Sequence, residues 1–144
     1  MVSTKGRYAL RLMIDIATYS DGNPVSLKDV SARQDISVKY LEQVVALLVK
    51  GRLLISVRGN NGGYMLTKDV ASYNTYEILC AAEGSLAPVA CLQTEVNICK
   101  RAEGCTTIDY WRGYYDVIKK YTEGVSLLDL VEREKNKSGN DYNI

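Results

Sequence analysis

Three of the four cysteines in this 144-residue chain fall in one polar segment, at Cys91, Cys99 and Cys105. Thiolates are soft ligands, and several of them on one loop can hold zinc or an iron-sulfur cluster. In a reducing cytoplasm such cysteines are ligands or reactive thiols more often than structural disulfides. Cys80 stands apart, at an apolar position of an expected helix, and we interpret it as a core residue. The cysteine segment is therefore a candidate sensor.

The composition excludes several kinds of catalysis. The chain has no histidine, so it contains no Ser-His or Cys-His catalytic pair and no histidine metal ligand. It also lacks a nucleotide-binding loop and carboxylates paired at a useful spacing. These features predict that the protein is not an enzyme.

No membrane association is expected. No apolar run approaches the length of a membrane span, and Met1–Arg7 leads into an amphipathic pattern rather than the apolar core of a signal peptide. The expected location is the cytoplasm.

Charge is divided unevenly along the chain, although the formal net charge is only +1. Residues 1–68 carry ten Lys and Arg against five Asp and Glu, a net charge of +5. Residues 69–144 carry eight against twelve, a net charge of −4. A basic front half favours a polyanionic partner, although an uneven solvated surface is an alternative that only a motif can exclude.

The front of the chain has the pattern of three helices followed by a β-hairpin. Apolar residues recur at three- and four-residue spacing in the first helix, and Ser26 and Ser37 can cap the next two. Gly and Asn then lie between two β-prone runs, and both residue types tolerate the positive φ angles of hairpin loops. The expected elements span residues 3–19, 26 to about 33, 38–50, 53–57 and 64–67. This order predicts a mainly α fold with a small β-hairpin wing, the winged helix-turn-helix.

A long helix is expected after the cysteines, following a fourth helix at residues 75–83. Its apolar residues have 3-4-3 spacing. So narrow a seam outside the main lobe has too little to bury against in its own subunit. We therefore expect a homodimer through this helix, and the alternative is a helix folded back onto its own core. The expected interface residues are Ile108, Trp111, Tyr115 and Ile118.

Four regions follow from this order. The first two are a winged helix-turn-helix DNA-binding domain at residues 1–84 and a cysteine-bearing sensor loop at residues 85–106. The third, residues 107–134, contains the dimerisation helix and a short closing helix at 125–131. The fourth is a polar, flexible tail at residues 135–144.

Candidate DNA contacts lie on the second helix of the motif, whose first residues enter the major groove in proteins of this kind. Lys39 can reach a guanine edge or a phosphate, Glu42 can accept a hydrogen bond from a cytosine amine, and Gln43 can pair with adenine. The expected set on this helix is Ser37, Lys39, Tyr40, Glu42 and Gln43.

Further contacts are expected on either side of that helix. Ser3, Lys5 and Arg7 begin the first helix, where they can contact phosphates without reading the sequence. Arg58 precedes the glycine-rich tip of the hairpin and can enter a narrow minor groove, and Asn60 in the tip completes the expected DNA-binding set.

Three separated motifs, STKGRYAL, SVKYLEQ and VRGNNGGYML, resemble in the same order the Rrf2 family of bacterial winged-helix regulators, which includes the IscR, NsrR and CymR types. The resemblance covers about Val2 to Val131. It implies a homodimeric transcription regulator, acting as a repressor on double-stranded promoter DNA. It also implies that Lys39, Glu42 and Gln43 are major-groove contacts and that Arg58 is the minor-groove arginine. The IscR branch commonly has Ser in place of Lys39, which implies a different operator.

The same resemblance implies a role for the cysteines. In cluster-binding members three cysteines in this region ligate an iron-sulfur cluster, and Cys91, Cys99 and Cys105 occupy those places. A 2Fe-2S cluster is favoured over 4Fe-4S, and because such clusters are oxygen-labile, the isolated protein can lack one. The histidine of the IscR type is replaced by Ile108. The fourth ligand is therefore a carboxylate, a group of the partner subunit or an exogenous ligand. The candidate carboxylates are Glu95, Glu103 and Asp109.

Two alternatives remain open at this point. In the first, the protein is a cluster-free regulator of the CymR type, controlled by thiol oxidation or by docking an enzyme of cysteine or cluster metabolism. In the second, the cysteines bind zinc, which three cysteines without a histidine make less favourable.

Overall fold

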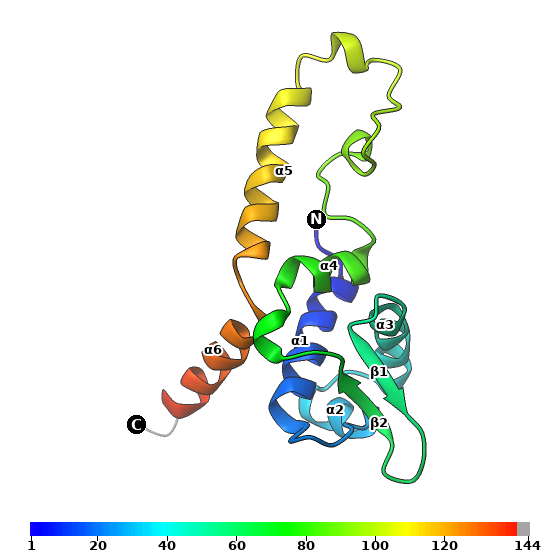
Figure 1. The fold of residues 1–144 in the computed structure, drawn as a ribbon, viewed down its shortest axis with the longest axis vertical. Helices are drawn as coiled ribbons and strands as arrows, with labels where there is room; N and C mark the ends of the chain where they lie inside the picture. Colours follow the sequence, from blue (N-terminus) through cyan, green and yellow to red (C-terminus); the bar gives the residue numbers. More distant parts are fainter. Residues whose placement is uncertain (141–144) are drawn as a thin grey trace.

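The computed structural model describes residues 1–140, and over that range the chain forms six α-helices and one two-stranded antiparallel sheet. Figure 1 shows a compact lobe at one end and a long arm, made by α5 and the segment before it, that rises away from the lobe. The elements are α1 (Thr4–Tyr19), α2 (Leu27–Gln34), α3 (Val38–Lys50), β1 (Leu54–Val57), β2 (Gly63–Leu66), α4 (Thr75–Glu83), α5 (Ile108–Glu123) and α6 (Leu127–Asn140). This order confirms the expected winged helix-turn-helix.

Side-chain caps set the starts of the helices in the lobe. The hydroxyls of Ser26 and Ser37 each accept a hydrogen bond from a backbone N–H in the first turn of α2 and α3. Asn74 and Glu77 form a reciprocal capping box at the start of α4. Because each cap satisfies an N–H that the helix itself leaves free, the starts of α2 and α3 agree closely with those expected from the sequence.

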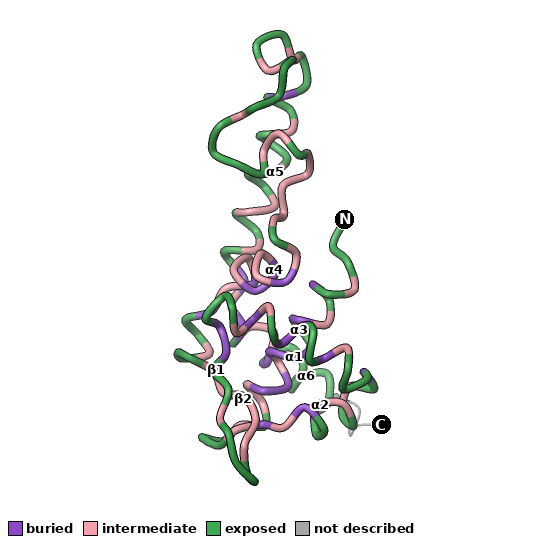
Figure 2. The backbone as a smooth tube through the Cα atoms, turned by 90° about the vertical axis from the view of Figure 1, so that its right-hand side faces the viewer, coloured by how far each residue is buried: buried purple, intermediate pink, exposed green. Residues whose placement is uncertain are grey.

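The core of the lobe surrounds α1. Ala9, Leu12, Met13 and Ile16 on one face of α1 are completely buried. This face packs against α3 and α4, while α2, α6 and β2 contact α1 around its circumference. In Figure 2 the buried residues gather in the lobe, and the arm is mostly exposed or half-buried. The helix α3 and the helix α4 therefore rest on one shared core.

The hairpin wing depends on glycine at two positions. Gly59, at the tip, has a φ of +116°, a region that side chains other than glycine rarely adopt. Gly63 begins β2, where a Cβ atom would lie only 2.3 Å from the backbone oxygen of Val25. Val25 and Tyr64 form an isolated β-bridge at that point. This close approach ties the wing to the loop between α1 and α2.

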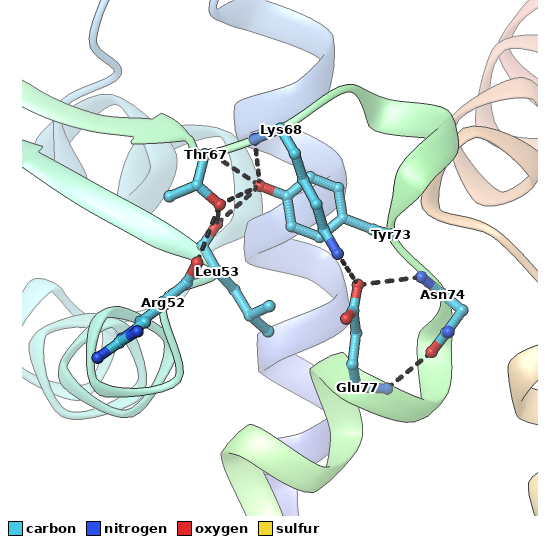
Figure 3. Close-up of polar contacts among 7 residues, drawn as sticks. All are labelled: Arg52, Leu53, Thr67, Lys68, Tyr73, Asn74 and Glu77. Atoms are coloured by element: carbon cyan, nitrogen blue, oxygen red, sulfur yellow. Dashed lines mark hydrogen bonds and ion pairs between the residues drawn. The ribbon is translucent and has the colours of Figure 1, made fainter.

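A buried tyrosine fastens the wing to the start of α4 (Figure 3). The Tyr73 hydroxyl donates a hydrogen bond to the backbone oxygen of Leu53 at 2.8 Å and accepts one from the backbone N–H of Thr67 at 2.7 Å. Its ring is 1% exposed, and the Lys68 ammonium lies 4.8 Å from the ring centroid. The start of β1 and the end of β2, which are paired at the open end of the hairpin, are therefore both held by this hydroxyl.

Replacing Tyr73 with Phe should destabilise the protein, because the ring would still fill the core while Leu53 and Thr67 would each lose a buried hydrogen-bond partner. The expected loss in the free energy of unfolding is about 1–3 kcal/mol, measured by urea denaturation. Tyr19→Phe is the matched control, because Tyr19 is 55% exposed and should lose little stability. Equal free energies of unfolding for the two variants would show that the hydrogen bonds of the Tyr73 hydroxyl do not stabilise the fold.

The closing helix is longer than expected. Leu127 and Val131 of α6 are buried, and α6 packs against α1. It then continues through Asn140, so the expectation of a flexible tail from residue 135 is wrong up to that residue. Asn136, Lys137 and Ser138 in this last part of α6 are polar and exposed. The last part of the expected tail, 141–144, lies outside the described residues. None of the helices described is long and apolar enough to cross a membrane.

Candidate DNA interface and cysteine segment

The expected major-groove residues lie at the start of α3. Ser37, Lys39, Glu42 and Gln43 are exposed there, while Leu41 between them is completely buried against the lobe. Tyr40 is half-buried, with its ring edge-on to Tyr8 of α1 at a centroid distance of 5.4 Å. Tyr40 therefore packs against α1 and the Ser37 hydroxyl caps α3, while the side chains of Lys39, Glu42 and Gln43 are exposed to solvent.

The expected phosphate contacts lie at the N-terminal end of α1. Lys5 and Arg7 are exposed. Ser3 is the N-cap of α1, and its hydroxyl donates a hydrogen bond to Oε1 of Glu83 at 2.6 Å. Ser3 therefore holds its own helix to α4 and does not simply face solvent.

The expected wing residues lie in or beside the hairpin loop. Arg58 and Asn60 are both exposed. Figure 1 shows α3 and the hairpin on the same side of the lobe, and α3 packs against β1. The two elements expected to enter neighbouring grooves therefore belong to one rigid part of the molecule.

The three cysteines of the arm lie on an open segment. Cys91 and Cys105 are half-exposed and Cys99 is exposed, and all three are free thiols. Within the part of the chain that the structure describes, no three Cys, Asp or Glu side chains come close enough together to hold a metal ion. The donors therefore suit a soft metal centre chemically, but holding one requires the segment to close.

Cys105 has an environment that favours the thiolate. Its Sγ lies 3.6 Å from the hydroxyl of Thr107 at the start of α5. Hydrogen bonds from the Thr107 side chain and backbone, with the positive charge of Arg101 as a smaller contribution, lower the pKa of the Cys105 thiol. The surroundings of Cys105 therefore favour its thiolate form.

The interpretation of Cys80 as a core residue does not agree with its position in the structure. It is a half-exposed thiol on α4, outside the fully buried cluster. Burial of its surroundings raises the pKa of the Cys80 thiol. Nearby, the hydroxyls of Tyr76 and Tyr115 lie 3.1 Å apart and join α4 to α5. That contact fixes the base of the arm.

The expected dimer stripe lies on the side of α5 that faces its own chain. Ile108 is buried, and Trp111, Tyr115 and Ile118 are half-buried. Trp111 and Ile118 line a hollow of about 540 Å³ together with Leu79 of α4 and the connector after it. A second apolar stripe beside it is exposed. Its members are Tyr110, Tyr114, Val117 and Tyr121.

An exposed recognition helix, a wing beside it and a helical core define a winged helix-turn-helix transcription regulator. The chain belongs to the Rrf2 family, whose model, described as an iron-dependent transcriptional regulator, matches residues 2–133. This confirms the resemblance carried by the three sequence motifs. As a transcription regulator of this family, the protein is not an enzyme.

Individual relatives agree with the family. The HTH-type transcriptional regulator IscR of Photorhabdus laumondii is 38% identical over 134 residues, which are 93% of this chain and 80% of that protein. Two solved structures superpose with a TM-score of 0.73. The global cysteine regulator CymR of B. subtilis is 31% identical, with 92% of this chain and 97% of that chain covered. T. potens IscR is 32% identical, with 93% and 88% covered.

Sequence reasoning missed two contacts that bear on the site. Glu83 reaches the first turn of α1, and Tyr76 meets Tyr115. The two residues of each pair are far apart in sequence, and neither a glutamate nor a tyrosine by itself indicates a long-range partner. The one available signal was that the charged Glu83 directly follows the apolar run at residues 78–82.

The thiols of Cys105 and Cys80 should differ in reactivity. In the reduced, metal-free protein Cys105 should react faster with iodoacetamide at pH 7, because its lowered pKa gives a larger thiolate fraction, whereas burial raises the pKa of Cys80. The difference should shrink as the pH rises toward both pKa values. Peptide mass spectrometry measures the rates. Thr107→Val should slow Cys105 alone, and an unchanged rate would contradict the role given to that hydroxyl.

Proposed function

We propose that this transcription regulator is a homodimer that binds promoter DNA and represses transcription, and that its DNA affinity depends on the state of Cys91, Cys99 and Cys105. The observation that carries the proposal is that the start of α3 and the wing are exposed together on one lobe. The chain also belongs to the Rrf2 family. The cysteines lie in the segment between α4 and α5, which with α5 forms the arm that rises away from the lobe (Figure 1).

DNA recognition would combine three surfaces. Lys39, Glu42 and Gln43 would read base edges in the major groove, and Arg58 would enter the minor groove. Lys5 and Arg7 would neutralise phosphates and set the register without reading sequence. The basic balance of residues 1–68, a net charge of +5, suits this partner.

A second copy would complete the arm. The exposed stripe on α5 presents Tyr110, Tyr114, Val117 and Tyr121 next to the half-buried stripe of Trp111 and Ile118. Together they make an apolar surface of the kind that homodimer interfaces bury. Two lobes held in this way would place two recognition helices at a fixed spacing, which is what paired half-sites require.

Binding to DNA should depend on Arg58 and Glu42 in different ways. The probe is a fluorescein-labelled duplex that the wild-type protein selects from a random-sequence library. Arg58→Ala should weaken binding, reduce the salt dependence of the association constant and relax preference in the flanking A·T-rich segment. Glu42→Ala should instead change the preferred bases at its position, at a cost of about 1–3 kcal/mol for the wild-type site.

Lys137→Ala is the matched control, because Lys137 is exposed on α6, away from α3 and the wing. It should leave affinity and sequence preference unchanged. If neither Arg58→Ala nor Glu42→Ala altered binding, the assigned surface would be wrong.

The sensor would be an iron-sulfur cluster held by Cys91, Cys99 and Cys105. Three thiols are a suitable donor set, and the family description names iron dependence. When bound, the cluster would supply a redox-sensitive centre. The chain would contribute the thiolates, and Thr107 and Arg101 would favour that form at Cys105. Closing of the segment around its ligands would order a region that joins α4 to α5, and so would bias the arrangement of the dimer.

Anaerobic reconstitution with iron and sulfide should give a coloured protein, measured by visible absorption with iron and sulfide assays. Cys99→Ser should lower the amount of cluster formed, because only two arm thiols would remain. Cys80→Ser is the control, and it should load normally because Cys80 lies on α4 outside the segment. A wild-type protein that stays colourless after reconstitution would exclude the cluster.

A cluster-free thiol sensor is the second candidate. The open arrangement of the three free thiols and the lowered pKa of Cys105 favour it. The solved CymR, named a cysteine regulator, has a similar fold. In this case oxidation of the arm cysteines, or docking of an enzyme of cysteine or cluster metabolism, would change DNA affinity. Operator binding before and after mild oxidation, without iron, separates this candidate from the first.

A further inference from the structure

The carboxylate of Glu83 closes the N-terminal end of α1. Its Oε1 atom accepts three hydrogen bonds, from the backbone N–H of Ser3 at 2.8 Å, the hydroxyl of Ser3 at 2.6 Å and the backbone N–H of Gly6 at 2.9 Å. Glu83 is the last residue of α4. The contact therefore fastens the end of one helix to the start of another, far away in sequence.

The electrostatics of this contact favour the ionised carboxylate. Burial acts to raise the pKa of Glu83, but the hydrogen bonds from Ser3 and Gly6, with the positive charge of Lys5, outweigh it and lower the pKa. A negative charge at a helix N-terminus is also stabilised by the helix dipole. At neutral pH the carboxylate is therefore charged, and its Oε1 atom is held by the N-terminal end of α1.

Gly6 makes the close approach of Glu83 possible. It is a buried residue in the first turn of α1. A Cβ atom at this position would lie 2.5 Å from Oε1 of Glu83, which is closer than real Cβ contacts come. Glycine at position 6 thus leaves the space that the Glu83 carboxylate occupies.

The fastened turn carries the basic side chains expected to meet the DNA backbone. Lys5 and Arg7 are exposed on it, while the Ser3 hydroxyl and the Gly6 amide are engaged by Glu83. A turn that was free to move would lose conformational entropy on binding, and this would weaken each phosphate contact. A turn that is already held loses less.

We propose that Glu83 is a positioning residue for DNA binding, which holds the first turn of α1 so that Lys5 and Arg7 can contact phosphates. The proposal rests on the proposed function as a DNA-binding regulator. Under this proposal the negative charge of Glu83 favours DNA binding, although it lies beside the surface that would contact the DNA phosphates. Simple charge arithmetic gives the opposite expectation, because removing an acidic residue near DNA should strengthen binding.

The test compares Glu83→Ala and Glu83→Gln with wild type in two measurements. In the first, without DNA, hydrogen exchange of the Gly6 amide should become about tenfold faster in Glu83→Ala and less so in Glu83→Gln, whose amide oxygen can still accept. In the second, affinity for the selected duplex should fall about three- to tenfold in Glu83→Ala, and the slope of log affinity against log salt should fall by about one.

Two further variants isolate the cause. Glu132→Gln is the matched control, because it removes an equal charge from an exposed position on α6, and it should leave both measurements unchanged. Gly6→Ala should reproduce the loss of DNA affinity while keeping the charge of Glu83. It also replaces Glu83→Ala as the test if that variant fails to fold.

The outcomes are distinguishable. If the wild-type protein selects no duplex, both the proposed function and the positioning role of Glu83 are wrong. This holds even if hydrogen exchange of the Gly6 amide is faster in the Glu83 variants. If wild type binds DNA but the Glu83 variants bind equally well or more tightly, the positioning role is overturned and the proposed function stands. Faster Gly6 exchange with unchanged DNA binding likewise overturns it.

Discussion

Burial of one face of α1 is the constraint on which the rest of the structure depends. Leu12, Met13 and Ile16 are completely removed from solvent, and each such side chain contributes about 1.5–3 kcal/mol when fully buried. The proposed recognition helix α3, the helix α4 at the base of the arm and the closing helix α6 all pack on α1. Because they share this one support, the proposed DNA-binding surface and the start of the arm cannot move independently without opening the core.

Two carboxylates fix α1 beyond this apolar packing. Asp15 is completely buried, yet Oδ1 and Oδ2 accept hydrogen bonds from Arg33 at 2.7 and 3.0 Å, and Gln34 donates another at 2.9 Å. The Arg33 guanidinium also lies 4.0 Å from the centroid of the Tyr19 ring. A buried charge with these partners is satisfied, whereas loss of a partner would leave it uncompensated. Asp15 joins α2 to α1, and Glu83 joins α4 to the N-terminal end of α1.

The lobe could be predicted from sequence because its signals are local. Ser26 and Ser37 cap the helices they precede, and the glycine-rich loop forms the hairpin. The DNA-binding and cysteine assignments came from residue types and motif order, and they remain predictions. Contacts such as Ser3 with Glu83 could not be predicted, because nothing local marks a partner about 80 residues away. The reach of α6 to Asn140 was missed because exposed polar residues have no apolar period to detect.

The arm poses a different physical problem from the lobe. Its contacts with the lobe run through α4, including the Tyr76–Tyr115 hydrogen bond, while Tyr110, Val117 and Tyr121 remain 65%, 69% and 65% exposed. Exposed apolar stripes of this length are unfavourable in water unless another surface covers them. The proposed second copy would supply that surface and would at the same time restrain the cysteine segment next to it. Dimer formation and the response of the thiols would then be linked, because the same helix, α5, begins three residues after Cys105 and carries the apolar stripe.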